Sequence, residues 1–413
     1  MRALYTIVLH LAVPFFLLRL WWRGRREPSY RDSVEERLGR YSTDVKPKMA
    51  WVHAVSVGEA RAAAPLVRAL QDLLPDHGIL MTCTTAAGRE TLKQVYGEGV
   101  LTAYLPYDTP HAVQGFIEHF RPRLGVLMET EVWPNLIAIC TNNGVPLMLA
   151  NARMSEKSAA QYRRLAALSR SAFASLAAVC AQSAGDAERL RGLGAKSVEV
   201  TGNLKFDVRP DLGQLAAGRA WRAALGRPVL LLASTREGEE RLLLDALPPP
   251  EGKRLVVVVP RHPQRFDEVA AYCQARRGKG EAPEVSHTIY LGDTMGEMAF
   301  YYGACDVAVI GGSFVPEGGQ NLIEALACGA PVVIGSSVFN FEQATRLAVE
   351  AGAAIQAPDA ASGITQAVKL LEDEPKRKAM ARAGLRLCEA HRGAAERHLE
   401  VCRRLLKKGS GPF

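Results

Sequence analysis

The sequence lacks the closely spaced cysteines that are typical of structural zinc sites. Its eight cysteines are spread over 413 residues without a Cys-x-x-Cys, and its nine histidines are scattered. A structural zinc site is therefore not expected. Several cysteines lie inside apolar runs, where they act as small core residues, and a reducing cytoplasm is the compartment that fits this usage.

The sequence also lacks basic segments interleaved with aromatic residues, on which nucleic-acid bases would stack. Its 51 basic and 43 acidic side chains are interspersed and leave a net charge of +8. This excess favours an anionic partner, such as an anionic lipid or a phosphorylated substrate, rather than a nucleic acid. With 48% apolar and 23% charged residues, the chain is long enough for two domains with full cores.

The N-terminal segment has almost no charge. Residues 3–18 carry none, and the apolar character continues beyond them with only Arg19 interrupting. About 20 such residues suffice to cross a bilayer, and the small residues of a signal-peptide cleavage site do not follow. Arginines follow instead, at positions 19, 23, 25 and 26, and they place the rest of the chain on the cytoplasmic side. Residues 1–26 are therefore predicted to form a retained membrane-spanning anchor. The alternative, a helix lying in the membrane surface, is favoured by His10, Pro14 and Arg19.

Short apolar runs alternate with amphipathic segments over the rest of the chain, which predicts parallel β-sheets covered by helices. The expected strands are residues 50–55, 79–84, 101–105, 124–128, 146–149 and 177–181, then 229–233, 255–259, 288–291, 307–310, 332–334 and 353–355. Turn-forming residues interrupt this series near 205–212. They divide the chain into an N-terminal domain, 27–207, and a C-terminal domain, 208–413, closed by helices. The predicted fold class is α/β, with two doubly wound Rossmann-like domains facing a cleft, and ligands bind beyond the carboxyl ends of such strands.

The segment from Gly311 to Val333 carries the most informative motif. An apolar run ending at Ile310 enters a glycine-rich loop, a helix opens after the loop, and another apolar run follows. Glycines let a backbone approach a ligand, and the N–H groups at a helix start favour negative charge. The segment therefore predicts a phosphate site and hence a nucleotide ligand, whose ribose hydroxyls Glu324 could bind.

Carboxylates follow two of the predicted strands in the N-terminal domain. Glu59 lies in the first turn of a helix, where it could be a general base or complete a capping box with Ser56, and the two roles can coexist. Glu129 and Glu131 stand one residue apart before a proline. A metal site there would lack an oxygen-rich partner cluster. We therefore interpret Glu129 as a polar residue that positions a neighbour or the transition state.

Cationic side chains follow strands in both domains. Lys205 lies at the domain junction, where it could neutralise a developing anionic phosphate, although an ordinary surface lysine is the alternative. Arg261 lies where a strand ends and a helix begins, a position suited to gripping phosphate or carboxylate, with a structural role as the alternative. The loop Gly292–Glu297 could hold a base or a ribose.

Taken in order, these motifs resemble the Kdo transferases of Gram-negative lipopolysaccharide assembly, over nearly the whole chain. The matching segments are residues 36–41, 51–59, 129–134, 202–206, 259–262, the glycine loop and 339–341. The resemblance implies an inverting glycosyltransferase of the GT-B fold at the cytoplasmic face of the inner membrane. It implies CMP-Kdo as the donor, bound mainly by the C-terminal domain, and the lipid A precursor (lipid IVA) as the acceptor, bound by the N-terminal one. No cofactor other than the donor substrate and no metal are expected.

The resemblance also implies roles for individual residues. The family's catalytic base falls on Glu59, and its proposed transition-state stabilisers fall on Glu129 and Lys205. The implied donor-binding positions are Pro260, Arg261, Met295, Gly296, Glu297, Asn321, Leu322, Ile323 and Glu324, to which the glycine loop adds Gly311, Gly312, Ser313 and Gln320. Inverting transfer needs one carboxylate to take a proton while cations receive charge on the leaving CMP, and these residues supply both.

The sequence departs from the family's usual pattern at four positions. Gln320 and Arg236 stand where histidine is common, and Ala325 and Ser336 stand where proline is common. Glutamine donates hydrogen bonds but cannot be charged, so the departures are expected to change donor affinity rather than the reaction. Two alternatives stay open: a GT-B enzyme or hexosamine epimerase that uses a UDP-sugar, and a membrane-anchored nucleotide-binding regulator without transferase activity.

Overall fold

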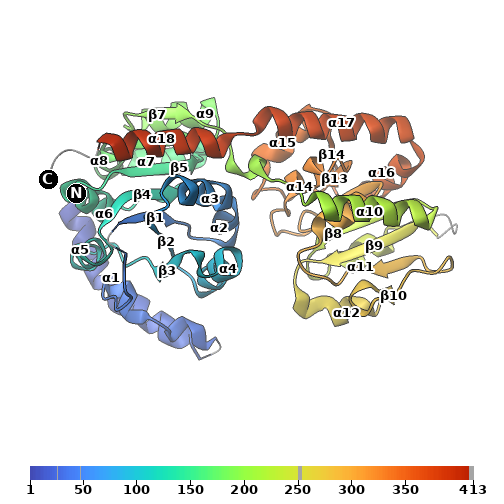
Figure 1. Ribbon diagram of the computed structural model, residues 1–413, viewed down its shortest axis with the longest axis horizontal. Helices are drawn as coiled ribbons and strands as arrows, with labels where there is room; N and C mark the ends of the chain where they lie inside the picture. The colour runs from blue at the N-terminus through green and yellow to red at the C-terminus, as the bar shows by residue number, and fades with distance from the viewer. Residues whose placement is uncertain (26, 47, 250–253, 409–413) are drawn as a thin grey trace. The chain divides into compact units, whose positions relative to one another are not determined.

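In this computed structural model the chain divides into two compact units, Met1–Asp207 with Arg392–Phe413 and Val208–His391 (Figure 1). The structure describes residues 1–25, 27–46, 48–249 and 254–408. Each unit contains one seven-stranded sheet, and all strand pairs are parallel. The predicted pair of doubly wound α/β domains is confirmed.

Unit 1 has the strand order β3-β2-β1-β4-β5-β6-β7. Its strands are β1 Met49–His53, β2 Gly78–Cys83, β3 Leu101–Tyr104, β4 Pro122–Met128, β5 Leu147–Ala152, β6 Ala178–Ala181 and β7 Val198–Val200. Its helices are α1 Arg2–Arg23, α2 Val57–Ala62, α3 Ala64–Leu73, α4 Ala86–Tyr96, α5 Pro110–Phe120, α6 Pro134–Asn142, α7 Glu156–Arg164, α8 Ala166–Ser175, α9 Ala184–Gly192 and α18 Ala394–Lys408, with 3-10 turns η1 Pro28–Arg31, η2 Val34–Leu38, η3 Gly97–Gly99 and η4 Leu204–Asp207.

Unit 2 has the strand order β10-β11-β9-β8-β12-β13-β14. Its strands are β8 Val229–Thr235, β9 Leu255–Pro260, β10 Ala275–Arg276, β11 Ile289–Leu291, β12 Val307–Ile310, β13 Val332–Ile334 and β14 Ala354–Gln356. Its helices are α10 Leu212–Leu225, α11 Glu239–Asp245, α12 Phe266–Ala270, α13 Met298–Ala304, α14 Leu322–Ala327, α15 Glu342–Glu350, α16 Ala360–Glu372 and α17 Glu374–His391, with 3-10 turns η5 Pro263–Arg265 and η6 Arg277–Lys279.

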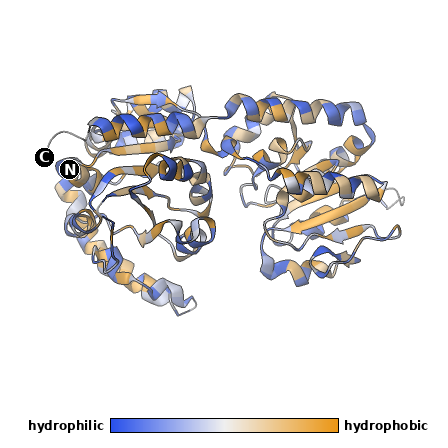
Figure 2. Cartoon of the chain, in the orientation of Figure 1, coloured by the Kyte–Doolittle hydropathy of each residue, from blue (hydrophilic) through white to orange (hydrophobic). Residues whose placement is uncertain are grey.

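The sheet of unit 1 separates two hydrophobic cores. Successive side chains of a strand point to opposite faces, so Trp51 packs in one core with Phe116 of α5, while its neighbour Val52 packs in the other with Leu66 of α3. Strands buried on both faces need apolar residues at every position. This is why the central strands are visible as continuous apolar runs, which Figure 2 shows within the sheets.

The strand orders fix where the functional residues gather. In unit 1, β1 lies between β2 and β4, and His53 at its end pairs with Leu127 near the end of β4. The chain leaves β1 toward one edge of the sheet and leaves β4 toward the other, which opens a crevice at the carboxyl ends of these two strands. In unit 2, β8 and β12 have the same relation.

Two edge strands were not predicted from the sequence. β7 has three residues, of which Glu199 and Val200 are exposed, and β10 has only two residues. Such short strands at sheet edges carry neither a continuous apolar run nor a clear alternation.

The prediction that residues 208–413 form one domain is wrong for the last helix. α18 belongs to unit 1, and Figure 1 shows this red helix among blue and green elements. The carboxylate of Asp207 accepts hydrogen bonds from the N–H groups of Gly393, at 2.6 Å, and Ala395. Leu399 and Cys402 of α18 are buried in the core that also contains Leu66. These contacts assign the helix to the first sheet.

The segment 36–41, which matches the family but had no predicted role, ties the N-terminal part of unit 1 together. Glu36 is buried and accepts two hydrogen bonds from Arg89 of α4, at 3.0 and 3.2 Å, and one from the N–H of Tyr104, at 2.7 Å. Gly39 has φ 79°, and a Cβ there would lie 2.2 Å from the carbonyl oxygen of Ala112 in α5. Only glycine fits this close approach, so the segment is structural.

Candidate active site

The predicted base Glu59 lies in α2, just beyond the carboxyl end of β1. Its carboxylate takes part in the helix cap: Oε1 accepts from the hydroxyl of Ser56 at 3.0 Å, and Oε2 accepts from the N–H of Val55 at 2.8 Å. The Ser56 hydroxyl in turn accepts from the N–H of Glu59 at 3.2 Å. The capping interpretation is therefore confirmed. The cap holds the carboxylate in a fixed place and does not exclude its use as a base.

The surroundings of Glu59 bring its pKa to neutrality. Burial is the largest cause and, with the negative charges of Glu129 and Glu131, raises this pKa to about 7. The hydrogen bonds from Val55 and Ser56 lower it but do not reverse the effect. A carboxyl with this pKa exchanges a proton readily near neutral pH, as a general base must.

The two other predicted catalytic residues form an ion pair. Glu129 follows β4 with φ 56°, a left-handed conformation that is uncommon outside glycine. Its Oε1 lies 3.4 Å from Nζ of Lys205 on η4, and the two side chains are 24% and 19% exposed. Because the charge of Glu129 acts on Glu59, the structure brings all three predicted catalytic residues into one electrostatically coupled group.

A buried polar network, which the sequence did not reveal, holds the turn that carries Lys205. Asn151, at the end of β5, accepts from the N–H of Leu204 at 3.0 Å. The carbonyl of Asn151 accepts from Nε2 of Gln182 at 2.9 Å, and Oε1 of Gln182 accepts from Nδ2 of Asn203 at 3.1 Å. These partners are 21 to 53 residues apart along the chain, so no local motif marks them.

The C-terminal helix supports this network through His398. The histidine is fully buried, and burial lowers its pKa to about 4, so the ring is neutral. Its Nδ1 lies 2.7 Å from the carbonyl of Ala394, and its Nε2 accepts from the N–H of Asn151 at 2.9 Å. A single neutral tautomer satisfies both bonds.

In unit 2, the glycine loop after β12 is held by an internal carboxylate. Glu239 is fully buried and accepts from the N–H of Gly312, at 2.6 Å, and from that of Phe314, at 3.0 Å. These two N–H groups therefore have an acceptor inside the protein, which corrects the expectation that such loop amides grip a phosphate. The assignment of Gly311, Gly312 and Ser313 to the donor site stays a prediction.

A cluster of arginines surrounds the end of β9. Nε of Arg261 donates to Oε1 of Gln320 at 3.2 Å, so two predicted donor-binding residues meet. Nη1 of Arg236 lies 2.5 Å from Nε2 of His262. Burial lowers the pKa of His262, and the charges of Arg236, Arg261 and Arg265 lower it further. Arg236 is paired with Glu317 and Arg265 with Glu240 and Glu268, so Arg261 is the arginine of this cluster that is best suited to a phosphate ligand.

The remaining polar candidates have internal partners. Glu297 accepts two hydrogen bonds from Arg277, at 2.8 and 3.2 Å, and this bonding lowers the pKa of Glu297. Nδ2 of Asn321, the N-cap of α14, donates to Oε1 of Glu324 at 2.8 Å. Glu324 is therefore oriented by its own helix cap, in the first turn of α14. Met295, an apolar candidate, is 57% exposed.

Four predicted donor-binding residues have buried side chains. They are Pro260, Ser313, Leu322 and Ile323. Their side chains belong to the core of unit 2, so only their backbones are available to a ligand.

The acidic pair after β4, Glu129 and Glu131, was weighed above as a metal site. Within residues 1–25, 27–46, 48–249 and 254–408, no group of three or more His, Cys, Asp or Glu side chains is arranged to hold a metal ion. Glu131 accepts instead from Nε1 of Trp133 at 2.8 Å.

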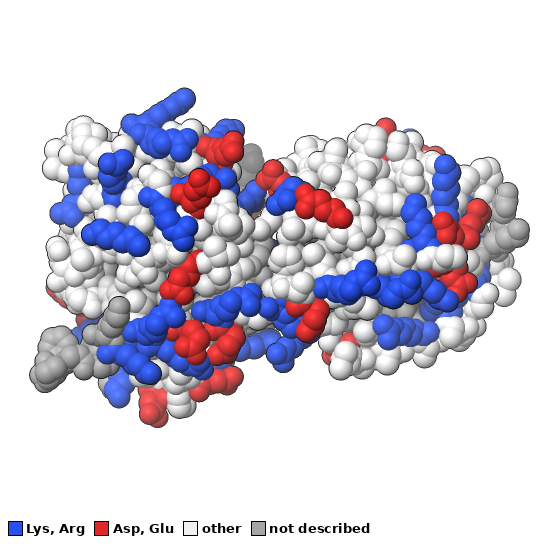
Figure 3. All heavy atoms as spheres, turned by 90° about the horizontal axis from the view of Figure 1, so that it is seen from above, with Lys and Arg blue, Asp and Glu red and all other residues white. Residues whose placement is uncertain are grey.

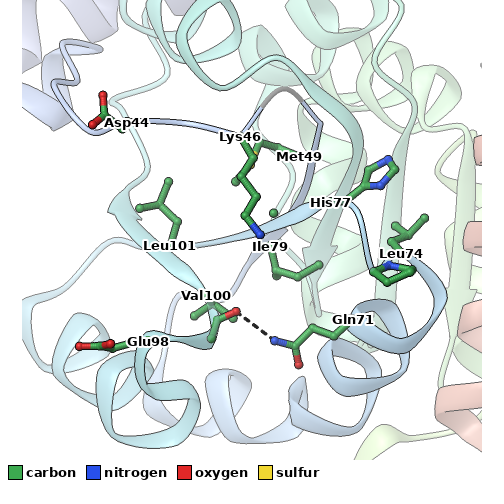
Figure 4. Close-up of a pocket in the computed structure, with 13 residues that line it drawn as sticks. Asp44, Lys46, Met49, Gln71, Leu74, His77, Ile79, Glu98, Val100 and Leu101 are labelled. Carbon is green, nitrogen blue, oxygen red and sulfur yellow. Dashed lines mark hydrogen bonds between the residues drawn. The ribbon is translucent and has the colours of Figure 1, made fainter.

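A hollow of about 410 Å³ opens at the amino ends of the first strands of unit 1, the opposite ends from those that carry Glu59 and Glu129 (Figure 4). The first residues of β1 and β2 and Leu101 of β3 line it, together with Gln71, which donates to the carbonyl of Gly99 at 3.0 Å. It contains none of the predicted site residues. Because ligands of doubly wound sheets bind at the carboxyl ends of the strands, this hollow is not the active site.

Charged side chains of both signs are interspersed on the face that Figure 3 shows. Pairs such as Arg403 and Glu396 of α18, whose Nη1 and Oε1 are 2.9 Å apart, have this character. Exposed pairs of this kind contribute little to stability, and the mixture matches the charge pattern of the sequence.

Comparison with known proteins covers both units. A family model described as 3-Deoxy-D-manno-octulosonic-acid transferase (kdotransferase) matches residues 32–208, and one described as Glycosyl transferases group 1 matches residues 281–386. The chain is 44% identical to the 3-deoxy-D-manno-octulosonic acid transferase of Bordetella pertussis, over 97% of this chain and 98% of the relative. It is 34% identical to that of Haemophilus influenzae, over 98% and 99%.

Solved structures agree on the architecture. UDP-GlcNAc 2-epimerase from Neisseria meningitidis superposes with a TM-score of 0.56 at 16% identity, over 86% of this chain and 100% of that one. Anabaena HepE in complex with UDP gives 0.56 at 15% identity, over 87% and 99%. Likeness at these identities concerns the fold alone.

Proposed function

This chain belongs to the 3-deoxy-D-manno-octulosonic acid (Kdo) transferase family, and from that membership we propose that it transfers Kdo from CMP-Kdo to lipid IVA with inversion at the anomeric carbon. It is a glycosyltransferase of lipopolysaccharide synthesis with the GT-B fold. The observation that carries the proposal is the coupled group of Glu59, Glu129 and Lys205 at the β1/β4 crevice, in which the pKa of Glu59 is about 7.

Glu59 is the proposed general base. An acceptor hydroxyl attacks the anomeric carbon of Kdo, the bond from that carbon to the CMP phosphate oxygen breaks, and the electron pair leaves with CMP. The Glu59 carboxylate takes the proton of the attacking hydroxyl, so charge and atoms balance. Its pKa near 7 makes it a base strong enough for this transfer, and a large fraction of it is ionised at near-neutral pH.

Lys205 and Glu129 act on the charge that develops in the reaction. The ammonium of Lys205 stabilises negative charge on the Kdo carboxylate and the departing phosphate. Glu129 holds that ammonium through the 3.4 Å ion pair and helps keep the pKa of Glu59 high.

Donor binding is assigned to unit 2. Arg261 binds the CMP phosphate with its guanidinium fork, which Gln320 orients through their hydrogen bond. Glu324 binds the ribose hydroxyls, and the residues from Met295 to Glu297 contact the base. CMP-Kdo is a substrate, and the proposal requires no further cofactor.

The assay that tests the proposal combines the purified chain with CMP-Kdo and lipid IVA and measures the product mass. A product heavier than lipid IVA by at least one Kdo residue is expected, with none when a UDP-sugar replaces CMP-Kdo. No product under conditions in which the Bordetella pertussis relative is active would sink the proposal. Product from a UDP-sugar alone would favour the alternative donor.

The pH profile tests the role of Glu59 directly. Its pKa of about 7 predicts that kcat/KM falls as the pH drops through this value, because the protonated carboxyl cannot accept a proton. In Glu131→Gln the negative charge near Glu59 is gone, while the amide oxygen still accepts from Trp133. The acidic limb of the profile, over which kcat/KM falls with decreasing pH, should therefore move to lower pH. Activity on the alkaline plateau should not change.

Glu118→Gln, which neutralises an exposed glutamate of α5, is the matched control and should leave the limb in place. A limb that does not respond to Glu131→Gln would show that another group governs the profile.

A further inference from the structure

Helix α1 has two faces with opposite environments. The larger apolar side chains on one face are exposed, and Leu11 reaches 77%. This exposed stripe consists of Leu4, Ile7, Val8, Leu11, Phe15, Leu18 and Trp22. The opposite face, partly buried, consists of Tyr5, Thr6, Leu9, Ala12, Val13, Phe16, Leu17 and Leu20. Both sets repeat at intervals of three and four residues, as the two sides of one helix do.

The partly buried face is docked on unit 1 by polar contacts. The hydroxyl of Tyr5 donates to Oδ2 of Asp108 at 2.9 Å, and Thr6 exchanges hydrogen bonds with Asn135 at 3.0 and 3.2 Å. Asp108 is 2% exposed and also accepts from the N–H groups of Asn135 and Leu136, which cap α6. The Tyr5 hydroxyl thus belongs to a buried network of the domain.

The other end of α1 is fastened as well. The rings of Phe16 and Tyr107 lie 5.5 Å apart. Nη2 of Arg31 donates to the carbonyl of Trp21 at 3.0 Å, and the guanidinium of Arg23 lies 4.5 Å from the centre of the Tyr30 ring. Contacts from Tyr5 to Phe16 therefore hold the helix against unit 1, and the turn η1 packs on its last residues.

A helix that spans a bilayer is surrounded by lipid on every side. Spanning would strip Tyr5 and Thr6 of their partners in the hydrocarbon and would deprive the buried Asp108 of a donor, and polar groups left without partners in such surroundings are strongly unfavourable. An in-plane helix keeps these bonds and buries only the exposed stripe. The polar residues that interrupt the apolar segment, His10 and Arg19, are exposed and lie to either side of the stripe, where an in-plane helix meets the headgroups.

We propose that α1 lies parallel to the membrane surface as part of unit 1, with its exposed stripe inserted among the acyl chains of an anionic bilayer. Trp21 and Trp22 stand at the end of the stripe, and the exposed Arg19, Arg23 and Arg25 complement anionic headgroups. Arg26, the fourth predicted arginine, lies outside the described residues. This proposal rests on the proposed function, which requires attachment to the membrane, and specifies the geometry of that attachment. It replaces the predicted spanning anchor by the in-plane alternative.

Spin labels attached to single cysteines along α1 distinguish these geometries. The full chain is bound to vesicles of phosphatidylglycerol and phosphatidylethanolamine, and relaxation by oxygen is compared with relaxation by an aqueous paramagnet. Labels at Leu4, Leu11 and Leu18 should be relaxed by oxygen, whereas labels at Leu9 and Val13 should be shielded from both agents. Labels at His10 and Arg19 should respond to the aqueous agent. The eight native cysteines are free thiols, so the unmodified chain treated with the same label supplies the background.

Equal oxygen relaxation at Leu9, Leu11 and Val13 would establish a spanning helix and overturn the proposal. Shielding of Leu4, Leu11 and Leu18 from both agents would mean that protein, such as a second copy, covers the stripe, and would overturn it too.

A partition measurement keeps the proposal testable without labels. Leu11→Glu should lower co-sedimentation with the same vesicles by about tenfold or more, because it removes a leucine that would insert among the acyl chains and adds a charge. Leu165→Glu, which alters a leucine that is 55% exposed between α7 and α8, is the matched control and should bind as the wild type does. Kdo transfer to acceptor dispersed in detergent is measured on the same proteins. Its absence in the wild type would contradict the proposed function and leave the membrane geometry unaffected.

Discussion

Glu59→Gln should lower kcat by about 10²–10⁴-fold, the usual contribution of a general base, with little change in KM. Glutamine keeps the shape of the side chain and can still accept one capping hydrogen bond, but it cannot take a proton. Mass-spectrometric or radiochemical measurement of initial Kdo transfer gives both constants.

The same variant should remain folded, and its stability should depend on pH in a defined direction. The pKa of Glu59 in the folded state, about 7, exceeds its unfolded value, so ionisation opposes folding increasingly as the pH rises from 4.5 toward 7. The variant lacks this penalty. Its thermal midpoint relative to the wild type should therefore improve as the pH is raised across that range.

Ser56→Ala separates the base from the cap. Loss of the cap costs about 1 kcal/mol of stability, and the Glu59 carboxylate stays, so kcat should fall less than about tenfold. Full activity in Glu59→Gln would contradict the catalytic role and favour a capping residue in a protein of another function. A large loss in both variants would instead point to misplacement of α2.

The fold was predictable because its central strands are buried on both faces. Runs such as Leu255 to Val259 admit apolar residues at every position, and a parallel sheet covered by helices follows from their alternation with helical segments. The position of α18 was not predictable. It depends on Asp207 and His398, whose partners lie 186 and 247 residues away in the sequence.

The candidate site was likewise predictable from the sequence only in part. Glu59, Glu129 and Lys205 stand at strand ends or turns within distinctive local motifs, so the sequence located them. Asn151 and Glu239 support the site from within the protein. In the sequence, Asn151 looks like an ordinary strand residue, and Glu239 is one of several glutamates. Only the folded chain shows that Asn151 holds the Lys205 turn and that Glu239 occupies the glycine-loop amides.

Two of the four departures from the family's pattern meet in one place. A Cβ at Gly312 would lie 3.0 Å from Nε2 of Gln320 and 3.3 Å from Cγ of Arg236, so these side chains both reach the same glycine. Gln320 cannot carry a positive charge, whereas Arg236 always does. Arg236 is paired with Glu317, so its charge is partly balanced inside the protein, and the two departures together change the charge distribution beside the glycine loop.

Lys205→Met should lower kcat by about 10²–10³-fold, the loss typical of one electrostatic stabiliser of a transition state. The Glu129 carboxylate would lose its ion-pair partner, and its unbalanced charge should raise the pKa of Glu59 further. The acidic limb of the pH profile is therefore expected to move upward in this variant, opposite to its movement in Glu131→Gln.

Two matched variants decide whether the charge or the position of Lys205 matters. Lys205→Arg keeps the charge and should retain more activity than Lys205→Met. Lys196→Met removes an exposed lysine of the same unit and should have no effect, which tests the alternative that Lys205 is an ordinary surface lysine. If Lys205→Met behaved as Lys196→Met does, the ion pair would be structural. A loss of kcat that Lys205→Arg largely restores requires instead that the charge of Lys205 acts on the transition state, and an upward shift of the limb in Lys205→Met shows that this charge also balances Glu129 beside Glu59.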